Sequence, residues 1–370
     1  MSGVSLAVYS TPEAFSLTEL DLLQMDRPHD VSDGDVLAAA LDTSPIDALH
    51  AQQSTGQPSV NAFTPLRSSR TKNPSREPRN QATTTYLQAI QAGKDMSTEW
   101  EKGLSFLNAT SPYGYHTHAQ VLNPGHEANG LVIVLGDSHA DMIKPRFVKL
   151  FEDATAAHQP FPTMVFKTEF GRAPLSCQAA TNTDFAMVKA MKPQVVFYSF
   201  HWLQYLRPEA PVGTKDTADP RCCKTLYDSC PFQTQADADE LLQRWQAQVQ
   251  ELVALGIRVF VAQQYVENSK YYYVYWIEGD KVKAVPPPVL RHEFESTHDH
   301  LLTAIANATH EANATLLNYS DNLCWDGECQ VVNGHGEPVY ADDNHIRAYI
   351  ARNYISVVDH VVTAARMPAT

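Results

Sequence analysis

The fold of this chain is decided by residues 131–139, which read Leu-Val-Ile-Val-Leu-Gly-Asp-Ser-His. The unbroken apolar run Leu131–Leu135 is typical of a strand that is buried on both faces of a parallel sheet. A polar block from Gly136 to His139 follows this strand directly and precedes a helical pattern. A serine in such a strand–turn–helix step lies at the carboxyl edge of the sheet, where backbone amides of the turn point at a ligand. We therefore expect Ser138 to be a nucleophile.

Four more short apolar runs repeat this theme along the chain. They are Thr163–Phe166, Val195–Tyr198, Ile257–Val261 and Thr315–Leu317. Their alternation with helical periods predicts an α/β fold, a three-layer α/β/α sandwich with a mainly parallel five-stranded sheet of the doubly wound, flavodoxin-like type. The ligand crevice of such a sheet lies at the carboxyl ends of its strands. We place this domain at residues 125–370.

Two helices are predicted from their apolar stripes. The first ends at Gly256, a residue suited to a C-terminal cap, and its stripe consists of Leu241, Leu242, Trp245, Val249, Leu252 and Val253. The second follows His345 at once, with a stripe of Ile346, Ile350, Tyr354, Val357, Val358 and Val361. We expect it to be the last helix of the domain.

The residues before the domain have a different character. Residues 1–80 are expected to form an acidic extension and linker of unknown role. Within them, Val36–Leu49 fits a short amphipathic helix, whereas Gln52–Gln81 is rich in Ser, Thr, Pro, Asn and Arg and has no apolar period. Residues 81–124 are expected to lead into the domain.

The composition is that of a globular protein, with 44% hydrophobic and 19% charged residues in a chain of 370. The formal net charge is −14. This charge argues against nucleic acid and against an anionic membrane surface as partners, because both need a basic footprint. The longest apolar runs are far shorter than the ~20 residues that span a bilayer.

The cysteines and glycosylation sequons indicate the compartment. Cys222, Cys223 and Cys230 cluster in one polar loop, and Cys324 and Cys329 lie close together further on. Short-loop pairs of this kind are typical of disulfides, which persist only in oxidising compartments. Four sequons agree with this, at Asn108, Asn307, Asn313 and Asn318. Residues 1–20 have neither the basic start nor the long apolar run of a signal peptide. We therefore expect the chain to lie on the luminal or extracellular face of the secretory pathway, either as part of a longer protein or as a truncated gene model.

A serine nucleophile needs an imidazole within hydrogen-bond reach, and a carboxylate that orients this imidazole. Residues 340–345 read Tyr-Ala-Asp-Asp-Asn-His. An Asp three residues before a His can fold back onto Nδ1, which leaves Nε2 free to accept the serine proton. We expect His345 to be the base for Ser138 and Asp342 to orient it, with Asp343 facing solvent or capping the final helix.

These two blocks resemble the SGNH (GDSL-like) hydrolase family, and most of all the SGNH domains fused to the C-terminus of membrane acyltransferase-3 proteins. That subgroup carries a Gly-Asp-Ser-His block, matched by residues 136–139, and a Tyr-x-Asp-x-x-His block, matched by residues 340–345. A cysteine pair shortly before the last block is matched by Cys324 and Cys329, and a Trp after the third strand by Trp202. The resemblance covers roughly residues 125–366.

The chain also departs from the family. His345 is followed by Ile346 and Arg347 where the family has Leu-Ser, and no Asn stands in the third block. The oxyanion hole therefore cannot be completed in the manner of the wider family. Gly171, in the turn after the second strand, is a candidate for a second oxyanion amide or a simple turn glycine. Trp202 is a candidate to line an acyl or sugar site, or a core tryptophan.

Two further patterns carry less weight. A group of metal-ligating residue types occurs at His292, Glu293, Glu295, His298, Asp299 and His300. Ser296 stands where the zinc-protease motif needs its second His, so we favour a solvated helix start and expect no metal site. The aromatic run Tyr271–Trp276 fits a sugar-stacking platform, but we favour an ordinary strand or lid.

The resemblance implies a serine-dependent O-acyl transferase or esterase that acts on a glycan hydroxyl, most simply with an acetyl group and without metal or nucleotide cofactor. It implies an acyl donor and a glycan as substrates, and a membrane acyltransferase domain in the parent protein as a partner. The chain would then be the extracytoplasmic part. Two alternatives stay open, a free-standing secreted carbohydrate esterase and a non-catalytic glycan-binding or interaction module.

Overall fold

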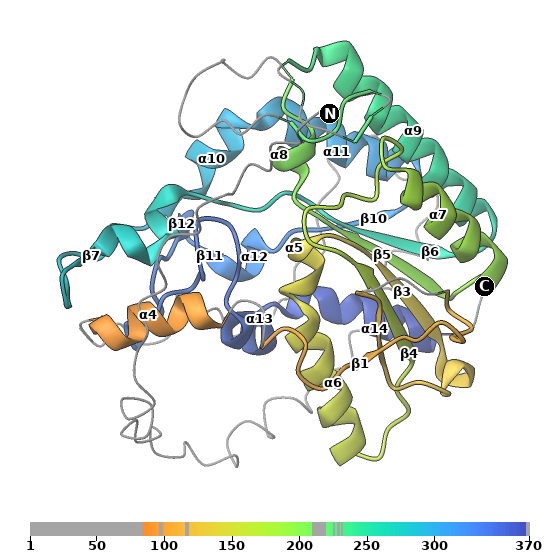
Figure 1. The fold of residues 1–370 in the computed structure, drawn as a ribbon, viewed down its shortest axis with the longest axis horizontal. Helices are drawn as coiled ribbons and strands as arrows, with labels where there is room; N and C mark the ends of the chain where they lie inside the picture. Colours follow the sequence, from red (N-terminus) through yellow and green to blue (C-terminus); the bar gives the residue numbers. More distant parts are fainter. Residues whose placement is uncertain are drawn as a thin grey trace, which may run out of the picture. The chain divides into compact units, whose positions relative to one another are not determined.

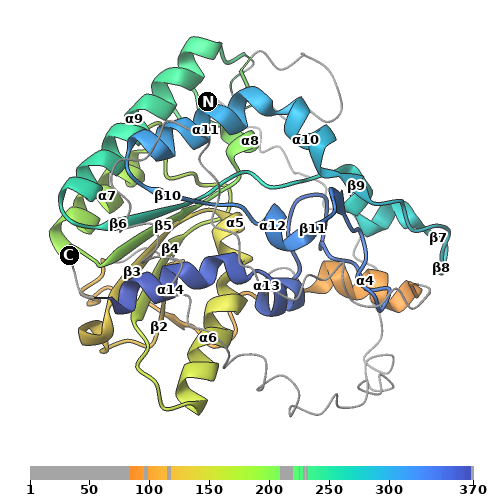
Figure 2. The ribbon, with the colours of Figure 1, turned by 180° about the vertical axis from the view of Figure 1, so that it is seen from behind.

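The computed structural model describes residues 84–95, 99–114, 118–208, 220–224, 226–227, 230 and 232–367. In this part of the chain a mainly parallel sheet is covered by helices on both faces, which confirms the predicted α/β/α sandwich (Figures 1 and 2). The predicted helix Val36–Leu49 and the linker Gln52–Gln81 lie outside the described residues.

The main sheet has the strand order β1-β2-β4-β3-β5-β6-β10. The five predicted strands are present and pair in parallel: β3 (Leu131–Gly136), β4 (Thr163–Thr168), β5 (Val195–Ser199), β6 (Arg258–Ala262) and β10 (Thr315–Leu317). Two short antiparallel strands extend the sheet beyond β4, namely β2 (Gln120–Leu122) and β1 (Ser105–Phe106). The described sheet therefore has seven strands instead of the predicted five, and the expected domain start at residue 125 falls after two of them.

The strand β3 separates two apolar layers. Val132 and Val134 point into the core that contains α6 (Lys144–Ala156), α13 (Ala348–Tyr354) and α14 (Asp359–Arg366). Ile133 and Leu135 point into the core that contains α7 (Ala179–Met191), α9 (Gln235–Ala254) and α11 (Asp299–Glu311). This alternation is the period of two that a strand imposes, and it explains why β3 is apolar throughout. Figure 2 shows α14 and α6 on one side of the sheet and α9 and α7 on the other.

The helix predicted before Gly256 is confirmed as α9. The prediction of one continuous helix after His345 is wrong. The chain there forms α13, a 3₁₀ turn η5 (Ser356–Val358) and α14. The main-chain N–H of Val357 donates to Asn322 Oδ1 at 3.0 Å instead of to a helical carbonyl. Because the Asn322 side chain accepts this N–H, the regular series of helical hydrogen bonds is interrupted, and α13 ends at Tyr354.

The remaining elements surround the carboxyl end of the sheet (Figure 1). They include the helices α4 (Tyr86–Lys94), α5 (Ser138–Asp141), α8 (Trp202–Tyr205), α10 (Arg291–Thr297) and α12 (Ser320–Leu323), and the 3₁₀ turns η3 (Ser269–Tyr271) and η4 (Tyr273–Trp276). The 3₁₀ turn η2 (Glu127–Asn129) lies at the other end, directly before β3. Small hairpins are formed by β7 (Ile277–Glu278) with β8 (Lys281–Val282), and by β11 (Cys324–Trp325) with β12 (Glu328–Cys329), which also pairs with β9 (Val289–Leu290). No helix within the described ranges combines the length and the apolar character needed to cross a bilayer.

All six cysteines form disulfides. The predicted pair Cys324–Cys329 is confirmed, and it closes the hairpin of β11 and β12. The polar loop contributes Cys223–Cys230, while Cys222 pairs with Cys177, which lies in the segment before α7. The sequence pattern does not indicate this last pair, because its two cysteines are 45 residues apart.

The sharp turn after β3 depends on Gly136. In the register of the sheet it lies opposite Ser199 of β5. A Cβ on Gly136 would lie 1.8 Å from the Ser199 carbonyl oxygen and 2.7 Å from Ala140 Cβ. The Ser199 oxygen is a backbone atom at the end of the inner strand β5, so it cannot move aside as a side chain could, and only glycine fits at position 136.

We predict that Gly136→Ala destabilises the domain by more than about 3 kcal/mol, which lowers Tm by roughly 6–12 °C for a domain of this size. Gly125→Ala is the matched control, since its added Cβ meets nothing within 4 Å and only its left-handed backbone (φ +79°) is unfavourable. The control should cost about 1–2 kcal/mol. Equal melting temperatures of the two variants in thermal denaturation would contradict the close approach.

Candidate active site

Ser138 is the first residue of α5, directly after the end of β3. Asp137 caps this helix, and its Oδ1 accepts the main-chain N–H of His139 at 2.8 Å. The first N–H groups of a helix have no partner within the helix, so the amide of Ser138 lies where an anionic group can be bound. The predicted strand–turn–helix step is therefore present.

Asp137 is fully buried and fixes this turn to the next strand. Its Oδ2 accepts the main-chain N–H of His201 at 3.1 Å and the hydroxyl of Tyr205 at 2.9 Å. Burial raises the pKa of Asp137 above its ordinary value, although the bonds from His201 and His139 oppose this rise. The aspartate of the first block therefore organises the turn and does not reach His345.

His345 lies on a short hairpin. The N–H of Ala341 donates to His345 O at 2.8 Å, Tyr340 and Ile346 form a β-bridge, and Arg347 N–H donates to Val339 O at 3.2 Å. At the tip, Asp342 Oδ1 accepts the main-chain N–H groups of Asn344 at 2.9 Å and of His345 at 2.7 Å. This is the local turn that an Asp side chain favours, and it brings Asp342 and His345 together.

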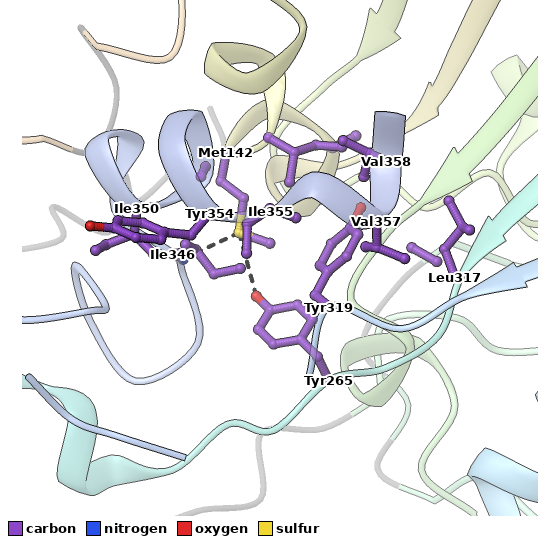
Figure 3. Packing of buried hydrophobic residues seen from close by; sticks show 14 of the residues in the cluster. Met142, Tyr265, Leu317, Tyr319, Ile346, Ile350, Tyr354, Ile355, Val357 and Val358 are labelled. Atoms are coloured by element: carbon purple, nitrogen blue, oxygen red, sulfur yellow. Dashed lines mark hydrogen bonds between the residues drawn. The ribbon is translucent and has the colours of Figure 1, made fainter. Parts of the chain in front are cut away.

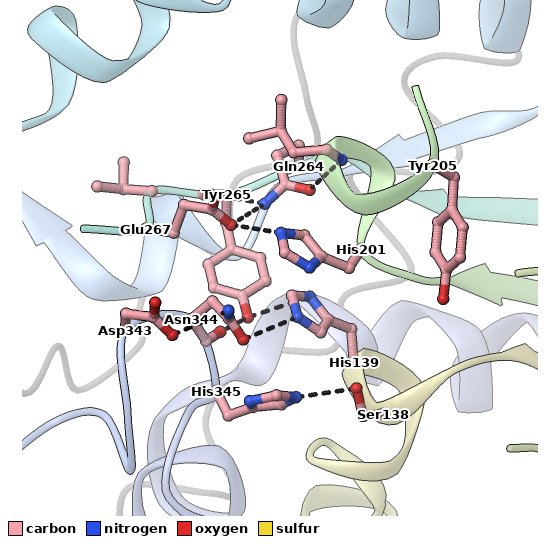
Figure 4. Close-up of polar contacts among 12 residues, drawn as sticks. Ser138, His139, His201, Tyr205, Gln264, Tyr265, Glu267, Asp343, Asn344 and His345 are labelled. Carbon is pink, nitrogen blue, oxygen red and sulfur yellow. Dashed lines mark hydrogen bonds and ion pairs between the residues drawn. The ribbon is translucent and has the colours of Figure 1, made fainter. Parts of the chain in front are cut away.

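A hydrogen bond between Ser138 and His345 links the two turns (Figure 4), and a second bond continues from His345 to Asp342. Ser138 Oγ lies 2.8 Å from His345 Nε2, and His345 Nδ1 lies 2.7 Å from Asp342 Oδ2. Burial on its own would raise the pKa of Asp342, but the hydrogen bond and charge of His345 lower this pKa below its ordinary value. An ionised Asp342 accepts Nδ1–H and leaves Nε2 as the acceptor for the Ser138 hydroxyl.

Asp343 takes no part in this chain of bonds. It is exposed, and its Oδ1 accepts from Asn344 Nδ2 at 3.0 Å. The expected alternative that it caps the final helix is wrong, because α13 begins only at Ala348. The sharp hairpin and the extended backbone of Arg347 delay the helix start by two residues.

A second imidazole, that of His139, lies beside His345. Their ring centroids are 5.1 Å apart in an edge arrangement. His139 is buried, with Nε2 3.4 Å from Asn344 Oδ1 and Nδ1 3.3 Å from the Tyr265 hydroxyl. Burial, reinforced by the charges of His201 and His345, holds the pKa of His139 well below its ordinary value. His139 is therefore neutral at neutral pH.

A third imidazole, that of His201, stacks on the other side of His139 with ring centroids 4.4 Å apart (Figure 4). His201 Nε2 lies 2.6 Å from Glu267 Oε2. Burial would lower the pKa of His201, but the charge of Glu267 raises it above its ordinary value, and His201 in turn lowers the pKa of Glu267. The sequence pattern predicts no role for either residue, although His201 lies three residues after the third predicted strand, Val195–Tyr198.

Residues of the apolar core contact the hairpin that carries His345 (Figure 3). Met142 Sδ accepts the main-chain N–H of Ile346 at 3.3 Å and lies 3.4 Å from the hydroxyl oxygen of Tyr265. Ile346 is fully buried, so the residue directly after His345 anchors the hairpin in the core. The Tyr265 hydroxyl donates to the carbonyl of Asn344, at the tip of the hairpin.

The two weaker candidates have different outcomes. The prediction that Trp202 lines the site is wrong. Its side chain is fully buried, its indole N–H donates to Ala262 O at 2.9 Å, and its ring packs on Trp245. Trp202 is a core tryptophan. Gly171 lies in the turn after β4 with φ +67°, a conformation that suits glycine. The same turn starts with Glu169, whose N–H donates to Gly136 O at 3.2 Å.

The aromatic run Tyr271–Trp276 forms the turns η3 and η4 instead of a strand. Tyr271 is buried and stacks on Tyr340 at a centroid distance of 3.9 Å. The N–H of Asn268, just before η3, donates to Asp343 O at 3.1 Å. This segment therefore braces the hairpin. The described ranges contain no group of three or more His, Cys, Asp or Glu side chains that could hold a metal ion.

Known proteins provide an independent comparison. A search of curated proteins found no match. Among solved structures, the chain is similar to the periplasmic domain of a lipopolysaccharide acetyltransferase from Salmonella ser. Paratyphi A, with 14% identity, coverage of 76% of this chain and 98% of that chain, and a TM-score of 0.46. It is also similar to a GDSL-like lipase from Bacteroides thetaiotaomicron, with 11% identity, 65% and 90% coverage and a TM-score of 0.35. A third similar structure is TesA, with 13% identity, 62% and 97% coverage and a TM-score of 0.35.

The family comparison is the decisive one. Residues 108–359 match the SGNH domain that is fused to AT3 domains. This range contains Ser138, Asp342 and His345 and spans more than half of the 370 residues. The chain belongs to the family of SGNH domains that are fused to AT3 domains.

Proposed function

We propose that this SGNH domain transfers or removes an acyl group, most simply acetyl, at a glycan hydroxyl, with Ser138 as the nucleophile. The observation that carries the proposal is the unbroken chain of hydrogen bonds from Ser138 Oγ through His345 to Asp342. The domains of this family are fused to AT3 domains, which supports acyl chemistry in general. It also supports a membrane acyltransferase domain as the partner that supplies the acyl group.

In the first half-reaction, Ser138 Oγ attacks the acyl carbonyl and its proton passes to His345 Nε2. Asp342 stabilises the imidazolium that forms. The amide of Ser138, with that of Gly171 as the second candidate, binds the oxyanion. The leaving alkoxide takes the proton from Nε2, and the acyl group remains on Ser138 as an ester.

In the second half-reaction, an acceptor hydroxyl gives its proton to His345 Nε2 and attacks the acyl ester. A sugar hydroxyl as acceptor completes a transfer, and water completes a hydrolysis. His345 then returns the proton to Ser138 Oγ, which restores the starting state. The same geometry serves the alternative of a free-standing secreted esterase. A product analysis with and without a glycan acceptor separates the two.

Three disulfides support an extracytoplasmic location, on the extracellular or luminal face. Three of the four sequons also fit this location, since Asn108, Asn307 and Asn313 are exposed. Asn318 does not fit, because it is buried and its Nδ2 donates to Gln263 Oε1 at 3.0 Å. A glycan on Asn318 is incompatible with this fold.

We predict that a fluorophosphonate labels the wild-type protein and not Ser138→Ala, and that the substitution lowers esterase turnover about a thousandfold or more. Ser105→Ala is the control, because Ser105 is exposed on the edge strand β1 and should keep both labelling and turnover. Unchanged turnover in Ser138→Ala would remove it as the nucleophile. The non-catalytic alternative predicts that neither the wild type nor the control is labelled.

The two adjacent aspartates should behave differently. Asp342→Asn replaces the acceptor of Nδ1–H by an amide that can hold the wrong tautomer, so we expect turnover to fall about a hundredfold or more. Asp343→Asn alters an exposed side chain and should leave turnover within about threefold of the wild type. Steady-state kinetics of both variants check this. An inactive Asp343→Asn beside an active Asp342→Asn would show that the orienting carboxylate is misassigned.

A further inference from the structure

The helix α4 and the residues after it precede the family match, which begins at residue 108, yet they contact the hairpin that carries His345. Thr84 Oγ1 donates to Gly336 O at 2.7 Å, and Gln88 Nε2 donates to His335 O at 3.2 Å. The described residues of 84–103 therefore contact residues 335–336, just before the hairpin that carries His345. We call this part of the chain the leading segment.

A buried ion pair connects the leading segment to the base of the hairpin. Arg347 donates from Nε to Asp95 Oδ2 at 2.7 Å and from Nη2 to the same oxygen at 2.6 Å. The side chains are only 6% and 9% exposed. Arg347 Nη1 also donates to Pro338 O at 3.1 Å, and Gln91 Nε2 donates to the second oxygen of Asp95, Oδ1, at 2.9 Å. A buried pair adds little net stability, but it fixes one geometry, because either charge alone is strongly unfavourable there.

The second contact of the leading segment is with His345 itself. Trp100 is 1% exposed, and its ring centroid lies 5.5 Å from that of His345 at an interplanar angle of 39°. Among the residues that the structure describes, the indole N–H of Trp100 has no hydrogen-bond partner, so its ring is held there by packing. Trp100 and His139 both contact the imidazole of His345, which restricts the rotation that would turn Nε2 away from Ser138.

We propose that Asp95, Arg347 and Trp100 are positioning residues, through which the leading segment holds His345 in the orientation that accepts the proton of Ser138. This inference rests on the proposed function. It gives a reason for Arg347, which lies two residues after His345, at the position where the family that this chain resembles has Ser. The base of the hairpin is tied to Asp95, a residue 252 positions away in the sequence.

The test compares Asp95→Asn and Trp100→Ala in the full chain with Asp359→Asn as a matched control. Asp359 forms a partly buried pair with Arg146 at 2.8 Å between α14 and α6, and the control variant should lose thermal stability without losing turnover. With 4-nitrophenyl acetate as the substrate, we expect Asp95→Asn and Trp100→Ala to lower kcat about tenfold or more, with KM within about twofold, because misplacement of about 1 Å is enough for such a loss. Unchanged kcat in both would overturn the proposal.

A second readout needs no substrate and separates failure of this inference from failure of the proposed function. A proton held between His345 Nδ1 and Asp342 Oδ2 at 2.7 Å should give a far-downfield proton resonance, and its absence in His345→Asn would assign it. We expect this resonance to be broadened or lost in Asp95→Asn and Trp100→Ala and to persist in Asp359→Asn. If the protein has no esterase activity, the resonance still tests the positioning. A resonance that is unchanged in both variants would overturn the inference whatever the activity.

Where Asp95→Asn does not fold, the double variant Asp95→Leu/Arg347→Met replaces it, since removing both charges together leaves no unpaired charge in the core. We expect this variant to fold and to lose kcat about tenfold, because the bond from Arg347 to Pro338 is lost as well. Wild-type kcat together with a wild-type resonance in the double variant would overturn the role of the ion pair.

Discussion

The hydrogen bond between Ser138 Oγ and His345 Nε2 joins two turns that lie 207 residues apart in the sequence. Each turn is fixed by its own means. The serine turn depends on Gly136, which alone fits against Ser199, and on the buried carboxylate of Asp137. The histidine turn depends on its hairpin bonds and on Ile346 in the core. Proton transfer needs both to be placed within a fraction of an ångström, so the packing of the whole sheet contributes to the site.

In the part of the chain that the structure describes, the carboxylate in direct contact with His345 is that of Asp342. Asp342 carries a lowered pKa and contacts Nδ1 directly. His139, which touches His345 on another side, stays neutral because burial and the neighbouring imidazoles lower its pKa. The charge of His201 is balanced by Glu267. In the proposed mechanism a positive charge on His139 would oppose the imidazolium that forms on His345, and this arrangement avoids it.

The sequence predicts the parts that are specified locally. The five parallel strands are mostly apolar because both faces of the sheet are covered, and Ser138, Asp342 and His345 lie in short turns whose residues determine their own geometry. The strand β1 has only two residues, both exposed, and β2 pairs antiparallel outside the alternation of strands and helices. The break of the last helix depends on a side chain 35 residues away. The burial of Trp202 and the contacts of Trp100 and His201 depend on tertiary packing, which periodicity does not encode.

The central claim is that the acyl group passes through a covalent ester on Ser138. The most direct measurement is mass spectrometry of the protein after rapid mixing with an acetyl ester and acid quenching, followed by proteolysis. We predict that the peptide containing Ser138 carries one acetyl group, and that this acetyl group forms and is lost at rates consistent with turnover. Turnover of the ester without any acyl group on Ser138, or with the acyl group on another residue, would contradict it.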